Sequence, residues 1–154
     1  MDKRLIGVTA ILGVLWCAVA LGQKTETDTK KEGGAKAMAI QKNVEAVLAK
    51  AGNNFLTIEI KGRDELVQVA REDVSGKTEL HVQVHCPFSG PPEKVFGKAG
   101  ITIPGGWKQE EFEAETHVQY NVTGTDAKTI AAFVDAVFTK LLKAKPDSFT
   151  IEKM

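Results

Sequence analysis

Cysteine is scarce in this chain, with two among 154 residues, Cys17 and Cys86. Cys17 lies in an N-terminal segment that the sequence predicts to be cleaved, which leaves Cys86 alone in the mature chain. One cysteine cannot form a disulfide within the chain. The domain must therefore be held together by its hydrophobic core, even in an oxidising compartment.

An excess of charge of one sign is also missing. The chain carries 20 basic and 20 acidic side chains, without a run of like charges or an internal repeat. Proteins that bind nucleic acids or membrane surfaces normally carry a basic excess, so the composition argues against nucleic acid and, apart from export, against a membrane as partner. The pair Gly105-Gly106 lacks the lysine and the helix start of a phosphate-binding loop, and we expect no cofactor.

Residues 1–22 have the pattern of a signal peptide. The basic pair Lys3-Arg4 precedes an almost wholly apolar run over 5–21, and Ala20 and Gly22 place small residues at the −3 and −1 positions before residue 23. The sequence therefore predicts an exported protein, periplasmic or extracellular. The alternative is a protein anchored in the membrane by residues 5–21, because this run nearly reaches spanning length.

Residues 23–36 are polar and contain no large apolar side chain. Such a segment cannot bury enough surface to offset the entropy that it would lose on ordering, so we expect a flexible linker here. The remaining residues, 37–154, are predicted to form a single domain.

Apolar periodicity predicts the elements of that domain. Spacing of three and four residues indicates helices over 37–51 and 126–145. Alternation indicates strands over 56–60, 66–71, 80–86 and 116–123, with a last alternation at Phe149 and Ile151. Short turns between the first three strands imply an antiparallel meander. The predicted fold class is α+β, an antiparallel sheet of four to five strands with two helices packed on one face.

Residues 87–106 are rich in proline and glycine, which forbids a long regular element. One helical turn is predicted over 93–98. A connection of this length is often functional, but its apolar residues are able to bury themselves, so we interpret it as a packed connection. These anchoring residues are Phe88, Val95, Phe96, Ile101, Ile103 and Trp107.

The order of a leading helix, a three-strand meander and a later strand-helix unit over 37–151 resembles the type III secretion chaperone-like, or YbjN-like, α+β fold. This resemblance implies a protein-binding or assembly role without catalysis, and a homodimer stays open. The segment 87–106 does not match the middle helix that those chaperones use for dimerisation.

The three histidines fall on the predicted polar face of the sheet. His81 and His85 are four residues apart in one strand, so they share a face at about 13 Å from each other, too far for both to bind one metal ion directly. His117 lies on the same type of face in another strand. With Gln83 and Gln119 they form the predicted ligand-binding set, and the three histidines are also the candidate metal ligands.

Trp107 completes the ligand-binding candidates as an aromatic side chain able to stack on a ligand. Cys86 follows His85, but neighbouring strand residues point to opposite faces, so the two are not expected to work as a nucleophile and its base. We interpret Cys86 as a small buried hydrophobe. No catalytic residue is predicted.

Three functional hypotheses follow. The preferred one is an exported, non-catalytic binding or chaperone-like module that binds a protein or small ligand on its polar sheet face or through 87–106. The second is a metal-binding protein or metal-dependent enzyme that uses the histidines. The third is a carrier of a small apolar ligand held between the helices and the sheet, with Trp107, Phe133 and Phe138 as walls.

Overall fold

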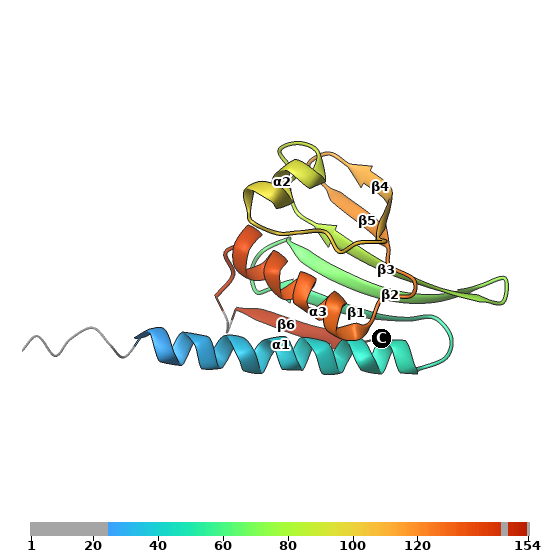
Figure 1. The fold of residues 1–154 in the computed structure, drawn as a ribbon, viewed down its shortest axis with the longest axis horizontal. Helices are drawn as coiled ribbons and strands as arrows, with labels where there is room; N and C mark the ends of the chain where they lie inside the picture. Colours follow the sequence, from blue (N-terminus) through green and yellow to red (C-terminus); the bar gives the residue numbers. More distant parts are fainter. Residues whose placement is uncertain (1–24, 146–147, 154) are drawn as a thin grey trace, which may run out of the picture.

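The computed structural model describes residues 25–145 and 148–153, with side chains from residue 37 onward. The predicted signal peptide and its alternative as an anchor lie outside the described residues. Within the described part of the chain, no helix is both long and apolar enough to cross a membrane. Figure 1 shows one sheet, with the helices gathered on one side of it and a long first helix running along its edge.

Helix α1 runs from Thr25 to Ala49 and so begins well before the expected start at residue 37. Within the segment 23–36, for which the sequence predicted a flexible linker, the structure is helical from Thr25 onward. Adding turns to an existing helix requires no new nucleus, whereas composition treats the segment as if it stood alone. The C-terminal half of α1 provides that nucleus, since Ile40, Val44 and Val47 are buried in the core.

The sheet has six strands, and each paired strand is antiparallel to its neighbour, in the order β4-β5-β3-β2-β1-β6. The strands are β1 (Asn54–Ile60), β2 (Leu66–Val74), β3 (Lys77–His85), β4 (Lys108–Glu113), β5 (His117–Asn121) and β6 (Phe149–Lys153). The α+β class with an antiparallel sheet is confirmed. The strand that the sequence analysis did not predict is β4. It contains one apolar residue, Phe112, and therefore shows no hydrophobic alternation.

Two helices complete the layer over the sheet. Helix α3 (Ala127–Ala136) begins at an N-cap, because the Asp126 carboxylate accepts a hydrogen bond from the Thr129 backbone N–H at 2.9 Å. It continues into a single π-helical turn, η1 (Val137–Leu141). The short helix α2 (Pro92–Lys98) lies in the proline-rich segment, which confirms the helical turn expected there.

An aromatic cluster fills the space between the helices and the strands β4, β5 and β3. Phe96 is fully buried and packs edge-on against Phe88 at 5.7 Å and Phe133 at 5.5 Å between ring centroids. Trp107 packs against Phe133 at 4.7 Å. The prediction that residues 87–106 form a packed connection is therefore confirmed.

Candidate functional site

The side chains that point away from the helices form a surface that we call the open face. On β3, Val82 and Val84 are fully buried in the core, whereas Gln83 and His85 lie on the opposite side of the strand and are partly exposed. In Figure 1 the helices α1 and α3 both lie on the other side of the sheet. No described helix covers the open face.

Strand register arranges the centre of the open face in three rows. The first row is Leu66, His85, His117 and Glu113; the second is Gln68, Gln83, Gln119 and Glu111; the third is Ala70, His81, Asn121 and Lys108. Five of the six predicted ligand-binding residues, the three histidines with Gln83 and Gln119, therefore lie in one patch. Their shared face was predicted from alternation, and the pairing of β5 with β3 brings them together.

A β-bulge in β4 adds a residue that the sequence did not single out. The register shifts between Gln109 and Glu111, which leaves Glu110 as the extra residue. Its carboxylate lies on the open face, where it accepts hydrogen bonds from Gln119 Nε2 at 3.3 Å and Asn121 Nδ2 at 3.2 Å. Partial burial acts to raise the pKa of Glu110, but these hydrogen bonds and the nearby His81 lower it overall.

The ring of His81 lies between two carboxylates. Its Nδ1 is 3.0 Å from Oε2 of Glu110, and its Nε2 is 3.7 Å from Oε2 of Glu79. Because an ionised carboxylate can only accept, Nδ1 carries the proton of this hydrogen bond. His81 is buried to 8% exposure despite lying on the open face, so the two glutamates shield it from solvent.

His117 and His85 stack across the β5–β3 pair, with ring centroids 5.3 Å apart and an angle of 27° between planes. The His117 side chain is only 10% exposed, and its Nε2 is buried without a hydrogen-bond partner. The carboxylate oxygens nearest the ring are Oε1 of Glu111, 3.6 Å from Nε2, and Oε2 of Glu113, 3.8 Å from Nδ1, and both are too distant for hydrogen bonds. His117 thus holds a polar atom that is buried just beneath this surface without a hydrogen-bond partner, and a buried polar atom in a folded protein normally has one.

The open face is strongly acidic. Its strand residues include seven glutamates and two lysines, namely Glu59, Glu72, Glu79, Glu110, Glu111, Glu113 and Glu152 with Lys77 and Lys108. Four of these glutamates, Glu110, Glu111, Glu113 and Glu152, lie on the edge strands β4 and β6, whereas most of the residues at the centre are amides and imidazoles. This charge distribution repels anionic ligands and attracts cationic ones.

The structure does not bring the histidines together as a metal centre. Among the described residues, no group of three or more His, Cys, Asp or Glu side chains is arranged to hold a metal ion. His85 and His117 stack face to face, an arrangement in which their nitrogen lone pairs do not converge on one point. The metal-binding hypothesis stays a prediction and gains no geometric support.

Trp107 is placed apart from the rest of the predicted ligand-binding set. It packs on the helix side of the sheet against Tyr120 and Phe133, and its Nε1–H donates to Thr125 Oγ1 at 3.0 Å. Trp107 therefore lies on the helix side of the sheet, the side on which the carrier hypothesis placed it, and not in the patch formed by the other five candidates. The reason is that burial of an aromatic ring in the core outweighs its use as an exposed platform.

The buried residues Cys86 and Phe138 have the packing roles expected of core side chains. Cys86 is 6% exposed, and burial raises the pKa of its thiol to about 12, so the nucleophilic thiolate is suppressed. Phe138 is fully buried and packs against Phe149 at 5.2 Å. Since Phe133 and Trp107 are also in mutual contact, the suggested walls of an apolar cavity pack against neighbouring rings.

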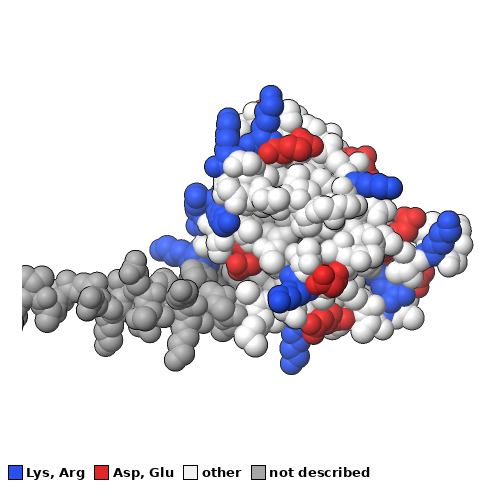
Figure 2. Space-filling view, viewed as in Figure 1, with Lys and Arg blue, Asp and Glu red and all other residues white. Residues whose placement is uncertain are grey.

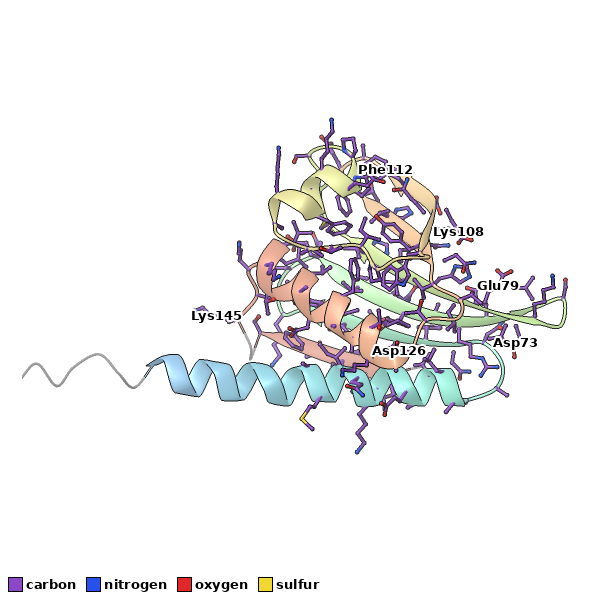
Figure 3. The ribbon with its side chains drawn as sticks, in the orientation of Figure 1. Asp73, Glu79, Lys108, Phe112, Asp126 and Lys145 are labelled. Atoms are coloured by element: carbon purple, nitrogen blue, oxygen red, sulfur yellow. The ribbon has the colours of Figure 1, made fainter. Side chains whose placement is uncertain are left out.

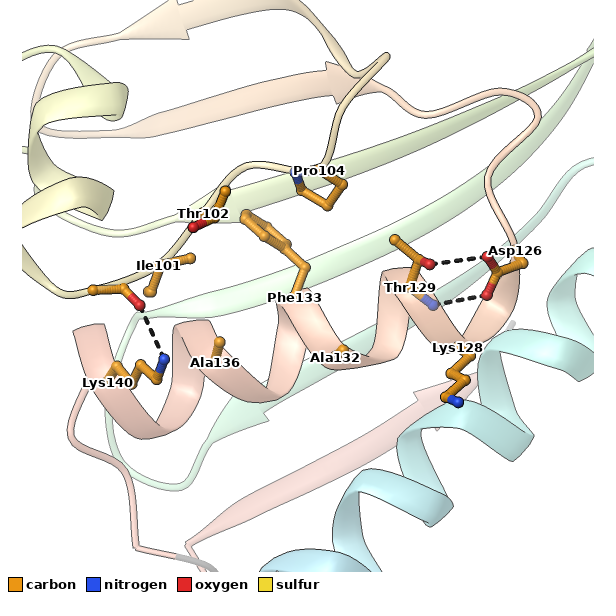
Figure 4. A pocket seen from close by; sticks show the side chains of 11 residues that line it. Ile101, Thr102, Pro104, Asp126, Lys128, Thr129, Ala132, Phe133, Ala136 and Lys140 are labelled. Carbon is orange, nitrogen blue, oxygen red and sulfur yellow. Dashed lines mark hydrogen bonds between the residues drawn. The ribbon is translucent and has the colours of Figure 1, made fainter.

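A second feature lies on the helix side of the sheet. A shallow groove of about 570 Å³ runs along the outer side of α3, between that helix and residues 100–104 (Figure 4). Figure 2 shows this side of the molecule, with both basic and acidic side chains placed around a broad uncharged area. The groove and the open face therefore differ in both shape and charge.

Comparisons with protein-family models, with curated proteins and with solved structures yield no match to this chain. The functional argument consequently rests on the geometry of the two surfaces.

Proposed function

We propose that this chain is a non-catalytic binding module whose open face binds a basic segment of another protein. The observation that carries the proposal is the combination of an acidic surface with the buried, unpartnered Nε2 of His117 at its centre. A partner that supplies lysine or arginine side chains would neutralise the glutamates of the rim. A hydrogen-bond donor or acceptor from its backbone would satisfy His117.

The shape of the surface supports a protein rather than a small molecule as the partner. Small-molecule sites are concave and largely apolar, whereas the centre of the open face is an array of amides and imidazoles on neighbouring strands. The amides Gln68, Gln83 and Gln119 lie side by side in one row and offer both donors and acceptors. Such a row suits the alternating polar groups of an extended backbone.

The surroundings of Cys86 and His81 support a non-catalytic module. The Cys86 thiol lies on the core side of β3 with its pKa raised, and the His81 ring faces carboxylates on both sides. Export and a chaperone-like role remain predictions of the sequence, as does a homodimer.

The test is binding of a fluorescein-labelled, arginine-rich decapeptide, followed by fluorescence anisotropy at low and physiological salt. The double variant Glu111→Lys with Glu113→Lys should weaken binding by about tenfold, because each exposed ion pair contributes roughly 0.2–1 kcal/mol and each reversal adds repulsion. Both side chains are more than half exposed, so the fold should be retained.

The matched control is Glu45→Lys with Glu93→Lys, which makes the same charge change on α1 and α2 on the helix side of the molecule. This control should bind the peptide nearly as the parent does. Equal losses in both double variants would show that only the overall charge matters. That result, or the absence of salt-sensitive binding, would refute the open face as the site.

A further inference from the structure

The groove along α3 has an apolar floor and small side chains on its helical wall. Phe133 and Ile101 are buried beneath it, and Pro104 borders it from the opposite side (Figure 4). On the helix, Ala132 is exposed and Ala136 is half-buried. Because alanine projects little beyond the backbone, another chain could approach this wall of the groove closely.

Each end of the groove carries a lysine. Lys140 lies at one end, and Lys128 lies at the other end beside Asp126, with its amino group turned toward α1 (Figure 4). The single carboxylate in the lining, that of Asp126, already accepts two hydrogen bonds from Thr129, one from its backbone N–H and one from its hydroxyl, both at 2.9 Å. The negative charge of Asp126 thus interacts with the N-terminus of α3.

The π-helical turn sets the position of the second lysine. Lys140 lies within η1, and its Nζ donates to the backbone oxygen of Gly100 at 2.9 Å, which ties the end of α3 to the opposite wall. A single π turn inside a helix is rare and is found frequently at functional sites. Here it closes one end of the groove with a cation.

The surroundings extend this positive charge. Residues 127–145 carry Lys128, Lys140, Lys143 and Lys145 against one acid, Asp135, whose pKa is raised by burial. The helix-side charge thus complements an acidic partner, the opposite of what the open face attracts.

From these features we propose that the α3 groove binds an extended acidic segment of a second protein partner, distinct from the one at the open face. Lys128 and Lys140 are twelve residues apart, which corresponds to roughly 18 Å along a helix. An extended chain spans that distance in roughly five to six residues. The expected ligand therefore carries carboxylates about five or six positions apart, with small or apolar side chains between them that contact the floor.

The experiment is a selection of phage-displayed random dodecapeptides on the immobilised chain, followed by affinity measurements on synthetic copies of the enriched peptides. Peptides with acidic residues at the predicted separation should be enriched. Their affinity should fall at least tenfold for Ala132→Trp, which fills the groove, and for Lys128→Glu with Lys140→Glu, which reverses its ends. Ala132 is exposed, so its replacement should not disturb the core.

The open-face variant Glu111→Lys with Glu113→Lys serves as the matched control and should leave this binding unchanged. Selection that yields no acidic peptides, or acidic peptides that bind the groove variants as well as the parent, would overturn the proposal. Urea unfolding of each variant checks that its fold is intact. Because the expected ligand of the groove is acidic and that of the open face is basic, a failure of this selection does not affect the test with the arginine-rich peptide.

Discussion

The two faces of the sheet come from the same strands but have opposite physical characters. On the helix side, alternate strand residues such as Leu56, Val69 and Val82 are fully buried and belong to the hydrophobic core. On the open face, most of the intervening residues are polar, and several are ionised. The difference shows that stability is concentrated on one face, which leaves the composition of the other face free to be set by binding.

The largest effect that should sharpen this contrast is the loss of a core aromatic ring. Phe96 is fully buried and contacts Phe88, Tyr120 and Phe133. Phe96→Ala should lower the free energy of unfolding by about 3–5 kcal/mol, because the change removes buried apolar surface and leaves a cavity. Urea denaturation followed by circular dichroism measures this loss.

The companion variant is Gln83→Ala, at the centre of the open face. Its free energy of unfolding should stay within about 0.5 kcal/mol of the parent value, because a partly exposed amide on a solvated face contributes little to stability. Figure 3 shows the side chains on the fold. If Gln83→Ala lowered the free energy of unfolding as much as Phe96→Ala, the open face would be part of the structural core. The division of roles between the faces would then fail.

The next effect is a loss of stability in alkali that originates on the core face. Burial raises the pKa of Cys86 from 9.0 to about 12, with a smaller contribution from Glu65. Burial likewise raises the pKa of Tyr120, whose buried hydroxyl has no hydrogen-bond partner. Both groups stay protonated in the folded chain. Their contribution to the free energy of unfolding is therefore fully present below about pH 9 and is lost as the pH rises toward 12.

The free energy of unfolding should fall by about 1 kcal/mol per pH unit for each of these groups, once that group is ionised in the unfolded chain. Urea unfolding between pH 8 and 10.5 measures it, and Cys86→Ala should flatten the slope because one of the two groups is removed. Stability that is constant over this range would contradict the burial of both groups. A Cys17→Ser background keeps the other thiol out of the measurement.

The two faces of the sheet could be predicted in part from local sequence. Alternation of apolar and polar residues placed His81, Gln83 and His85 on one face, and the register confirms this because successive strand residues must point to opposite sides. Apolar character alone identified the packed anchors Phe88 and Phe96 in the proline-rich connection, and both are buried.

What local sequence could not supply is the pairing of distant strands. The insertion of β5 beside β3, which stacks His117 on His85, depends on contacts between residues far apart in the chain. The bulge that turns Glu110 toward His81 has no local signal, because β4 lacks a hydrophobic period. The acidity of residues 110–113 was visible, but its place beside the histidines was not.

The smallest expected effect concerns the histidine stack, and it tests whether the open face is as ordered as the core. Partial burial lowers the pKa of His85 below its ordinary value of 6.5, and repulsion from His117 lowers it further. Replacing His117 by glutamine, His117→Gln, should raise the pKa of His85 toward 6.5 without restoring it fully, because the burial remains. Proton NMR titration of the imidazole resonances follows this change directly.

The linked effect on stability has a definite sign. Since the folded state disfavours protonation of His85, the unfolded chain takes up more protons below pH 6.5, and acidification from pH 7 to 5 should reduce the contribution of this group to stability. The carboxylates that face the pair are those of Glu111 and Glu113, which lie near the His117 ring, and that of Glu115, which lines the same hollow as His85. A pKa of His85 that does not change in His117→Gln would mean that the two rings do not interact in solution. The open face would then lack the order at its centre that a specific binding surface requires.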